Sequence, residues 1–178
     1  MVQHYNLLYR SSKFSFFLLL TLVIPIIYNL DIILDIWLVA VPPYTKEFCV
    51  FVLLAYLADA LATPLGASIY ANGNIKKLQI SISIVFLIQL IASYFALRAK
   101  LPPYIVSVFI LLSHSIHYML YVYFCVKLCK LQLKDYLRNT ILPIIPVCIL
   151  SVLIPTIIHI NVYNNLFISL LWIMIEVL

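Results

Sequence analysis

The chain has 178 residues, of which 66% are apolar and 10% are charged, and its net charge is +5. A soluble domain is about half apolar and a quarter charged, and a small domain leaves much of its area in water, so this composition excludes a water-soluble fold and predicts a protein embedded in lipid. The eleven lysines and arginines are spread over the predicted loops without forming a basic face, and we therefore expect no binding to nucleic acid.

Apolar segments along the chain are long enough to cross the bilayer core, which takes about 20 residues of helix. They cover residues 14–37, 47–70, 78–98, 104–126, 140–160 and 163–178. Pro42-Pro43, Asn72-Gly73-Asn74 and Pro102-Pro103 end the first three, because these residues favour turns. Residues 1–13 form a segment before the first span, and residues 127–139 a short amphipathic or surface stretch. The sequence thus predicts an all-α, polytopic membrane helix bundle of about six transmembrane helices.

The distribution of positive charge predicts the orientation of these helices. Eight lysines and arginines lie in the N-terminal segment, the loop at Lys76 and residues 127–138, and three lie on the other side. Because cytoplasmic loops are enriched in positive charge, we expect the N-terminus and these two other segments to be cytoplasmic. The expected location is the cell inner (plasma) membrane, crossed several times.

Three ionisable residues are expected at one depth near the middle of the membrane. At a rise of 1.5 Å per residue, Asp59 lies about 18 Å along the second span, and His114 and His117 lie roughly 15 and 20 Å along the fourth. Charged groups at this depth are costly and usually face a cavity or a partner. Two interpretations stay open: the three residues line a cavity, or they only pack and bond between neighbouring helices. A role in proton coupling is a further hypothesis, because histidine titrates near neutrality.

Polar residues form a stripe on each of these two spans at helical periodicity. On the second span the stripe contains Tyr56, Asp59, Thr63, Gly66 and Tyr70, and on the fourth it contains Ser107, His114, Tyr118, Tyr121 and Cys125, with His117 at its edge. We predict that Asp59, Thr63, His114, His117, Tyr118 and Tyr121 line a substrate path.

Two further features complete the set of candidate site residues. Asp31 lies near the outer end of the first span, where it is predicted to face an outer vestibule, while Asp35 is interpreted as part of a solvated helix end.

Cys125 and Cys129 are spaced neither for a zinc site nor for a disulfide framework. We therefore predict no metal site and no catalytic residues.

A series of short motifs resembles a known family. Residues 12–17 (SKFSFF) lead into Ile24-Pro25-Ile26-Ile27, and residues 33–38 (ILDIWL) and 41–45 (VPPYT) follow, and then Pro64-Leu65 and residues 69–79 (IYANGNIKKLQ). In order and spacing the series is similar to the iLxxWLgxxP run and AxGxIKxxQ loop of bacterial O-antigen and capsule repeat-unit flippases. These flippases belong to the multidrug/oligosaccharidyl-lipid/polysaccharide exporter superfamily.

The resemblance implies an α-helical carrier of 12 to 14 spans, of which this chain would be the last six and thus the C-terminal fragment. Such a carrier moves an undecaprenyl-diphosphate-linked glycan to the outer leaflet for polysaccharide biosynthesis, driven by a gradient of H⁺ or Na⁺ and without a bound cofactor. It implies a polysaccharide polymerase and glycosyltransferases as partners. Lys76 and Lys77 would attract the diphosphate or, on the plainer interpretation, only anchor the loop in the cytoplasm.

Other functions stay open. A multidrug exporter of the same superfamily would have the same architecture. An integral-membrane enzyme acting on prenyl diphosphates is less expected, because Asn29, Asp31 and Asp35 lack the NDxxDxxxD order and a second aspartate-rich loop. A passive assembly subunit is the last alternative.

Overall fold

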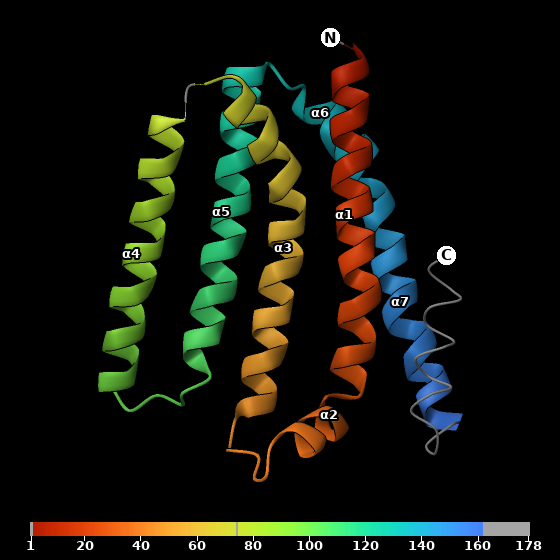
Figure 1. Cartoon of the computed structure of the whole chain (residues 1–178), viewed down its shortest axis with the longest axis vertical. Helices are drawn as coiled ribbons and strands as arrows, with labels where there is room; N and C mark the ends of the chain where they lie inside the picture. The colour runs from red at the N-terminus through yellow and green to blue at the C-terminus, as the bar shows by residue number, and fades with distance from the viewer. Residues whose placement is uncertain (1, 74, 162–178) are drawn as a thin grey trace.

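The computed structural model describes residues 2–73 and 75–161, and the chain is helical over nearly all of these ranges, with no strand in them (Figure 1). The elements are α1 (Val2–Tyr28), α2 (Leu30–Trp37), α3 (Thr45–Ala71), α4 (Lys76–Arg98), α5 (Ile105–Cys129), α6 (Leu133–Tyr136), the π-helical turn η1 (Leu137–Ile141) and α7 (Leu142–Asn161).

Five helical segments are long and apolar enough to cross a membrane. They are Tyr5–Tyr28, Thr45–Ala71, Lys76–Arg98, Ile105–Cys129 and Leu133–Leu153. The prediction of an all-α helix bundle is therefore confirmed for the described residues, and these five segments are compatible with membrane spans. The sixth predicted span, residues 163–178, lies outside the described residues.

The long helices run side by side in one row of neighbours (Figure 1). Helix α5 packs against both α3 and α4, α1 packs against α3, and α7 packs against α1. The start of α1, the α3–α4 turn and the α5–α6 corner lie at one end of the bundle, while α2 and the α4–α5 connection lie at the other. The three segments that the charge pattern assigned to one side thus share one end, and the side of the membrane that this end faces stays a prediction.

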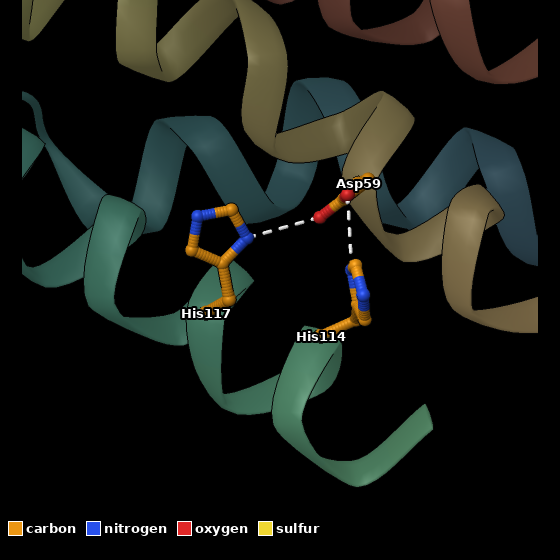
Figure 2. A group of neighbouring side chains, drawn as sticks. All are labelled: Asp59, His114 and His117. Atoms are coloured by element: carbon orange, nitrogen blue, oxygen red, sulfur yellow. Dashed lines mark hydrogen bonds and ion pairs between the residues drawn. The ribbon is translucent and has the colours of Figure 1, made fainter. Parts of the chain in front are cut away.

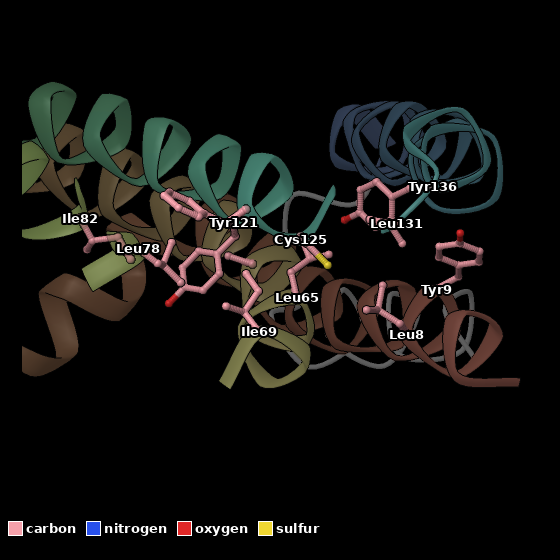
Figure 3. Close-up of a cluster of buried hydrophobic side chains, with 12 residues drawn as sticks. Leu8, Tyr9, Leu65, Ile69, Leu78, Ile82, Tyr121, Cys125, Leu131 and Tyr136 are labelled. Atoms are coloured by element: carbon pink, nitrogen blue, oxygen red, sulfur yellow. The ribbon is translucent and has the colours of Figure 1, made fainter. Parts of the chain in front are cut away.

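Two clusters of buried side chains hold the helices together. The first lies at the end where α1 begins and joins α1, α3, α4, α5 and α6 (Figure 3). The second joins the middle of α1 to α3 and α7 through Phe16, Leu20, Val23, Leu57, Leu61 and Ile144, among others. Large apolar side chains also cover the outside, as on α4, where Leu87, Ile88 and Tyr94 are about 60% exposed. Such a surface suits contact with lipid tails rather than with water.

The first span differs from its predicted bounds of 14–37. Helix α1 begins at Val2 and ends at Tyr28, and α2 follows as a separate short helix. The early start has a packing reason, because Leu8 and Tyr9 are buried in the first cluster. The helix passes through Pro25 and breaks at Asn29, whose backbone N–H and side-chain amide both donate to the Pro25 carbonyl, at 3.1 and 2.9 Å. Asparagine side chains compete in this way with the helical hydrogen-bond pattern.

The stretch at residues 127–139 has the expected amphipathic character, because most of its side chains are exposed while Leu131 and Tyr136 are buried. Helix α5 continues to Cys129, and the chain turns at Lys130 in a left-handed conformation (φ 53°). The next helical segment begins at Leu133 and runs through η1 into α7. Tyr136 is fully buried there, so one side of this exposed, basic stretch packs against the bundle.

Candidate functional site

The three ionisable residues that were expected at one depth lie in direct contact (Figure 2). Asp59 projects from the middle of α3, and His114 and His117 project toward it from α5. Nδ1 of His117 lies 3.0 Å from Oδ1 of Asp59 in a hydrogen bond, and Nδ1 of His114 lies 2.9 Å from Oδ2. We call these three residues the Asp–His–His triad. Each carboxylate oxygen therefore has its own imidazole neighbour.

The spacing of the histidines explains how one carboxylate meets both. Residues three apart on a helix lie on one face, about one turn from each other. The two rings are perpendicular, with centroids 6.2 Å apart, and the Asp59 side chain enters between them from α3. The i, i+3 pair on α5 thus supplies two nitrogens to one point on the neighbouring helix.

One atom of the triad is not satisfied. Nδ1 of His114 is buried and has no hydrogen bond of acceptable geometry, although it lies 2.9 Å from Asp59. This contact is therefore a close electrostatic pair and not a hydrogen bond. Unpaired buried polar atoms are uncommon in native proteins. The triad consequently has spare capacity to bind a proton or a cation.

The triad lies partly open to the outside of the chain and is bordered by aromatic rings. The side chains of His114, His117 and Asp59 are 17%, 15% and 28% exposed. Phe86 on α4 contacts both imidazoles, with centroid distances of 5.6 and 5.7 Å, and Tyr56 lies 6.0 Å from His114. An acidic group bordered by rings and not fully buried can receive a small ligand or an ion.

The two predicted path tyrosines lie deeper in the bundle than the triad. The Tyr121 ring packs against His117 with centroids 4.7 Å apart, and its hydroxyl lies 2.7 Å from the Tyr70 hydroxyl. The Tyr118 hydroxyl lies 3.2 Å from that of Tyr136. Tyr121 is 7% exposed and belongs to the first buried cluster. These contacts join helices, and the prediction that the two tyrosines line a path is not tested by them.

Four other predicted residues lie apart from the triad's contacts. Thr63 is exposed and donates to the Asp59 backbone carbonyl at 3.0 Å, within its own helix. Asp31 lies on α2 and forms an exposed ion pair with Lys46 of α3. Lys76 and Lys77 are exposed at the start of α4, directly after the turn in which Gly73 has φ +75°. The expectation that Gly73 permits a tight turn is confirmed.

Two residues beside the triad were missed by the sequence analysis. Phe86 was one apolar residue among many, so the sequence offered no signal for it. Gln89 lies in the middle of α4, and its side-chain oxygen accepts from Ser113 of α5 at 2.8 Å. A glutamine in the middle of an apolar span was a usable signal, because polar side chains there bond to neighbouring helices.

The chain was compared with family models, with curated proteins and with solved structures, and none of the three comparisons found a match.

Proposed function

We propose that this chain forms part of a membrane carrier and that the Asp–His–His triad lines the path of its cargo or its coupling ion. The observation that carries the proposal is the meeting of a carboxylate and two imidazoles from α3 and α5 within an otherwise apolar bundle. An ionisable residue at mid-membrane costs several kcal/mol and usually marks a substrate, ion or proton pathway. Three such residues in contact strengthen that interpretation.

We further propose that the cargo is an undecaprenyl-diphosphate-linked oligosaccharide, moved across the bacterial inner membrane for O-antigen or capsule synthesis. The motif series over residues 12–79 supports this choice. The exposed Lys76 and Lys77, which follow the Gly73 turn, support it too, because lysines at a loop are accessible to a diphosphate headgroup. An ion gradient would drive the movement, and no catalytic step is needed.

A cell carrying the complete gene tests both parts of the proposal. We expect that deletion of the gene makes lipid-linked glycan accumulate on the inner leaflet and removes surface polymer. Complementation with Asp59→Asn or His117→Gln should restore at most about a tenth of the wild-type surface polymer, because each change removes a group expected in the path. Asp35→Asn is the matched control and should complement fully, since Asp35 is exposed and was interpreted as part of a solvated helix end.

Separate outcomes contradict the two parts. If the deletion strain exports normal amounts of glycan, the proposed cargo is wrong. If Asp59→Asn complements as well as Asp35→Asn at equal membrane abundance, the triad does not lie on the path.

A multidrug exporter is the second candidate, favoured by the rings of Tyr56 and Phe86 beside the Asp59–His114 pair. Aromatic faces and a carboxylate together suit amphipathic cations. Increased drug sensitivity of the deletion strain, with normal surface polymer, would favour this candidate over the flippase.

A further inference from the structure

The triad has the composition and the spacing of a metal-binding site. Its candidate ligand atoms, one from each of Asp59, His114 and His117, lie within 4.8 Å of one another. A tetrahedral ion with ligand bonds of 2.0–2.2 Å places its ligand atoms about 3.4 Å apart. The two observed nitrogen–oxygen distances, 2.9 and 3.0 Å, run to different oxygens of Asp59. The side chains would therefore have to rotate to bring one carboxylate oxygen and both nitrogens onto one ion, and the span of 4.8 Å between the candidate atoms sets the size of that movement.

The contact of His114 is a second observation that points to a ligand. Its Nδ1 is buried and lies 2.9 Å from Oδ2 of Asp59, yet it makes no hydrogen bond. His117, by contrast, makes a hydrogen bond to Oδ1. A cation between the three groups would accept a lone pair from both nitrogens and one carboxylate oxygen, which leaves none of the three ligand atoms without a partner.

The donor set indicates which class of ion would bind. Imidazole nitrogens suit zinc, copper, iron and nickel, whereas calcium and magnesium require oxygen ligands. Two histidines and one carboxylate are the protein ligands of catalytic zinc sites and of non-haem iron sites, both of which leave at least one position open. The partial exposure of the triad is compatible with a water molecule in that position.

We propose that Asp59, His114 and His117 bind one divalent transition-metal ion of the zinc class. The ion would link α3 to α5 near the middle of the membrane, with a water or a ligand atom in the fourth position. The sequence predicted no metal site, because its cysteines lack ligand spacing and because the three ligands of the triad come from two distant segments. This inference does not rest on the proposed transport, since metal binding is measured without a cargo.

Zinc binding to the purified full chain tests the inference. The chain would be held in lipid nanodiscs, with any affinity tag removed and with bound metal stripped by a chelator, and Zn²⁺ would be titrated in competition with a chromophoric chelator. We expect one saturable site per chain. Asp59→Asn, His114→Gln and His117→Gln should each weaken Zn²⁺ binding by at least about tenfold, since loss of even an outer-shell group costs 10–100-fold.

Matched controls exclude the other ligand types of the chain. Binding should be unchanged in the double variant Cys125→Ser/Cys129→Ser and in the double variant His4→Gln/His159→Gln, and also in Asp31→Asn. Loss of Zn²⁺ binding in any of these controls, or wild-type affinity in the three triad variants, would overturn the proposal.

A ligand exchange keeps the test valid if a triad variant does not fold. His117→Cys retains three ligands and replaces a nitrogen by a thiolate, which also binds this class of ion. Its Co²⁺ complex should show a sulfur-to-cobalt charge-transfer band that the wild-type complex lacks. Zn²⁺ should also raise the unfolding temperature of wild type and of His117→Cys, because a ligand that binds only the folded state stabilises it. Absence of both the band and the shift would contradict the assignment.

Discussion

Two polar clusters occupy successive turns of α5, and they differ in how their polar atoms are satisfied. The tyrosine cluster comprises Tyr70, Tyr118, Tyr121 and Tyr136, whose hydroxyls pair at 2.7 and 3.2 Å, and Tyr136 is fully buried. The Asp–His–His triad is partly exposed and leaves Nδ1 of His114 without a hydrogen bond. Neighbouring turns of one helix therefore carry polar side chains that differ in how completely they are hydrogen-bonded.

The physical difference lies in charge. A tyrosine presents an apolar ring to the core and needs one partner for its hydroxyl, so a pair of tyrosines is self-sufficient inside a bundle. A carboxylate between two imidazoles carries charge in at least one protonation state, and charge within the membrane is costly unless a partner or a cavity compensates it. We infer that the tyrosine cluster stabilises the fold and that the triad is kept for a ligand.

The largest expected effect comes from removing the most buried ring. Tyr136→Ala should lower the free energy of unfolding by about 3–5 kcal/mol, because truncation of a buried aromatic side chain leaves a cavity. Tyr136→Phe should cost only about 1 kcal/mol, since it keeps the ring and loses one hydroxyl pair with Tyr118. Unfolding with SDS in mixed micelles measures both. Equal losses for Ala and Phe would show that the hydroxyl, and not packing, dominates the tyrosine cluster.

A smaller loss is expected where α3 approaches the Tyr121 ring. A Cβ added at Gly66 would lie 2.8 Å from Cε1 of Tyr121, which is too close for any real contact. The ring is buried and its hydroxyl is held by Tyr70, so it cannot move freely. Gly66→Ala should therefore cost about 1–3 kcal/mol, the usual range for overpacking.

A double-mutant cycle provides the control for this prediction. Tyr121→Leu removes the ring that the new methyl group would meet. Gly66→Ala should consequently cost at least about 0.5 kcal/mol less in the Tyr121→Leu background than in wild type. Additive losses would place the cause elsewhere on α3.

The sequence predicted the triad because depth and helical phase can both be counted along a span. Asp59 and the two histidines were expected at similar depth, and the stripes placed them on single faces of their helices. The structure adds that the two faces meet. Whether the two faces meet depends on how α3 is rotated about its axis relative to α5. Packing between the helices determines this rotation, and the local sequence does not. Thr63 shows the same limit, because it shares the stripe with Asp59 and yet is exposed.

The wrong boundaries of the first span had one local cause, at Asn29, and one cause in contacts with segments that are distant in sequence. The apolar run from residue 14 to residue 37 has no charge before Asp31, so hydropathy alone gave one span. The break at Asn29 depends on a side-chain bond to Pro25, and the early start of α1 depends on Leu8 and Tyr9 in the first cluster. Residues of α1 and α5 bury Tyr136. The charge pattern at residues 127–139 gives no sign of this burial.

A third prediction compares the triad with the tyrosine cluster directly. In metal-free protein, Asp59→Asn should change the free energy of unfolding by less than about 1 kcal/mol, because polar contacts between helices in membranes average about 0.6 kcal/mol. The amide also removes a charge that is costly to bury. The same unfolding assay applies, with chelator present. A loss as large as that of Tyr136→Ala would mean that the triad is a structural element, and the contrast between the two clusters would fail.

The smallest effect is expected at the exposed ion pair between Asp31 and Lys46. Both side chains are more than half exposed, at 66% and 51%, and exposed pairs contribute about 0.2–1 kcal/mol or nothing measurable. Asp31→Asn and Lys46→Met should therefore each change the free energy of unfolding by less than about 0.5 kcal/mol, and added salt should reduce the change further. A larger, salt-insensitive loss would show that α2 needs this pair in order to stay at the end of the bundle. A small loss, together with loss of Zn²⁺ binding in Asp59→Asn but not in Asp31→Asn, would show that the two aspartates differ in role because of their surroundings. Asp31 lies beside one exposed lysine, whereas Asp59 lies beside two partly buried imidazoles.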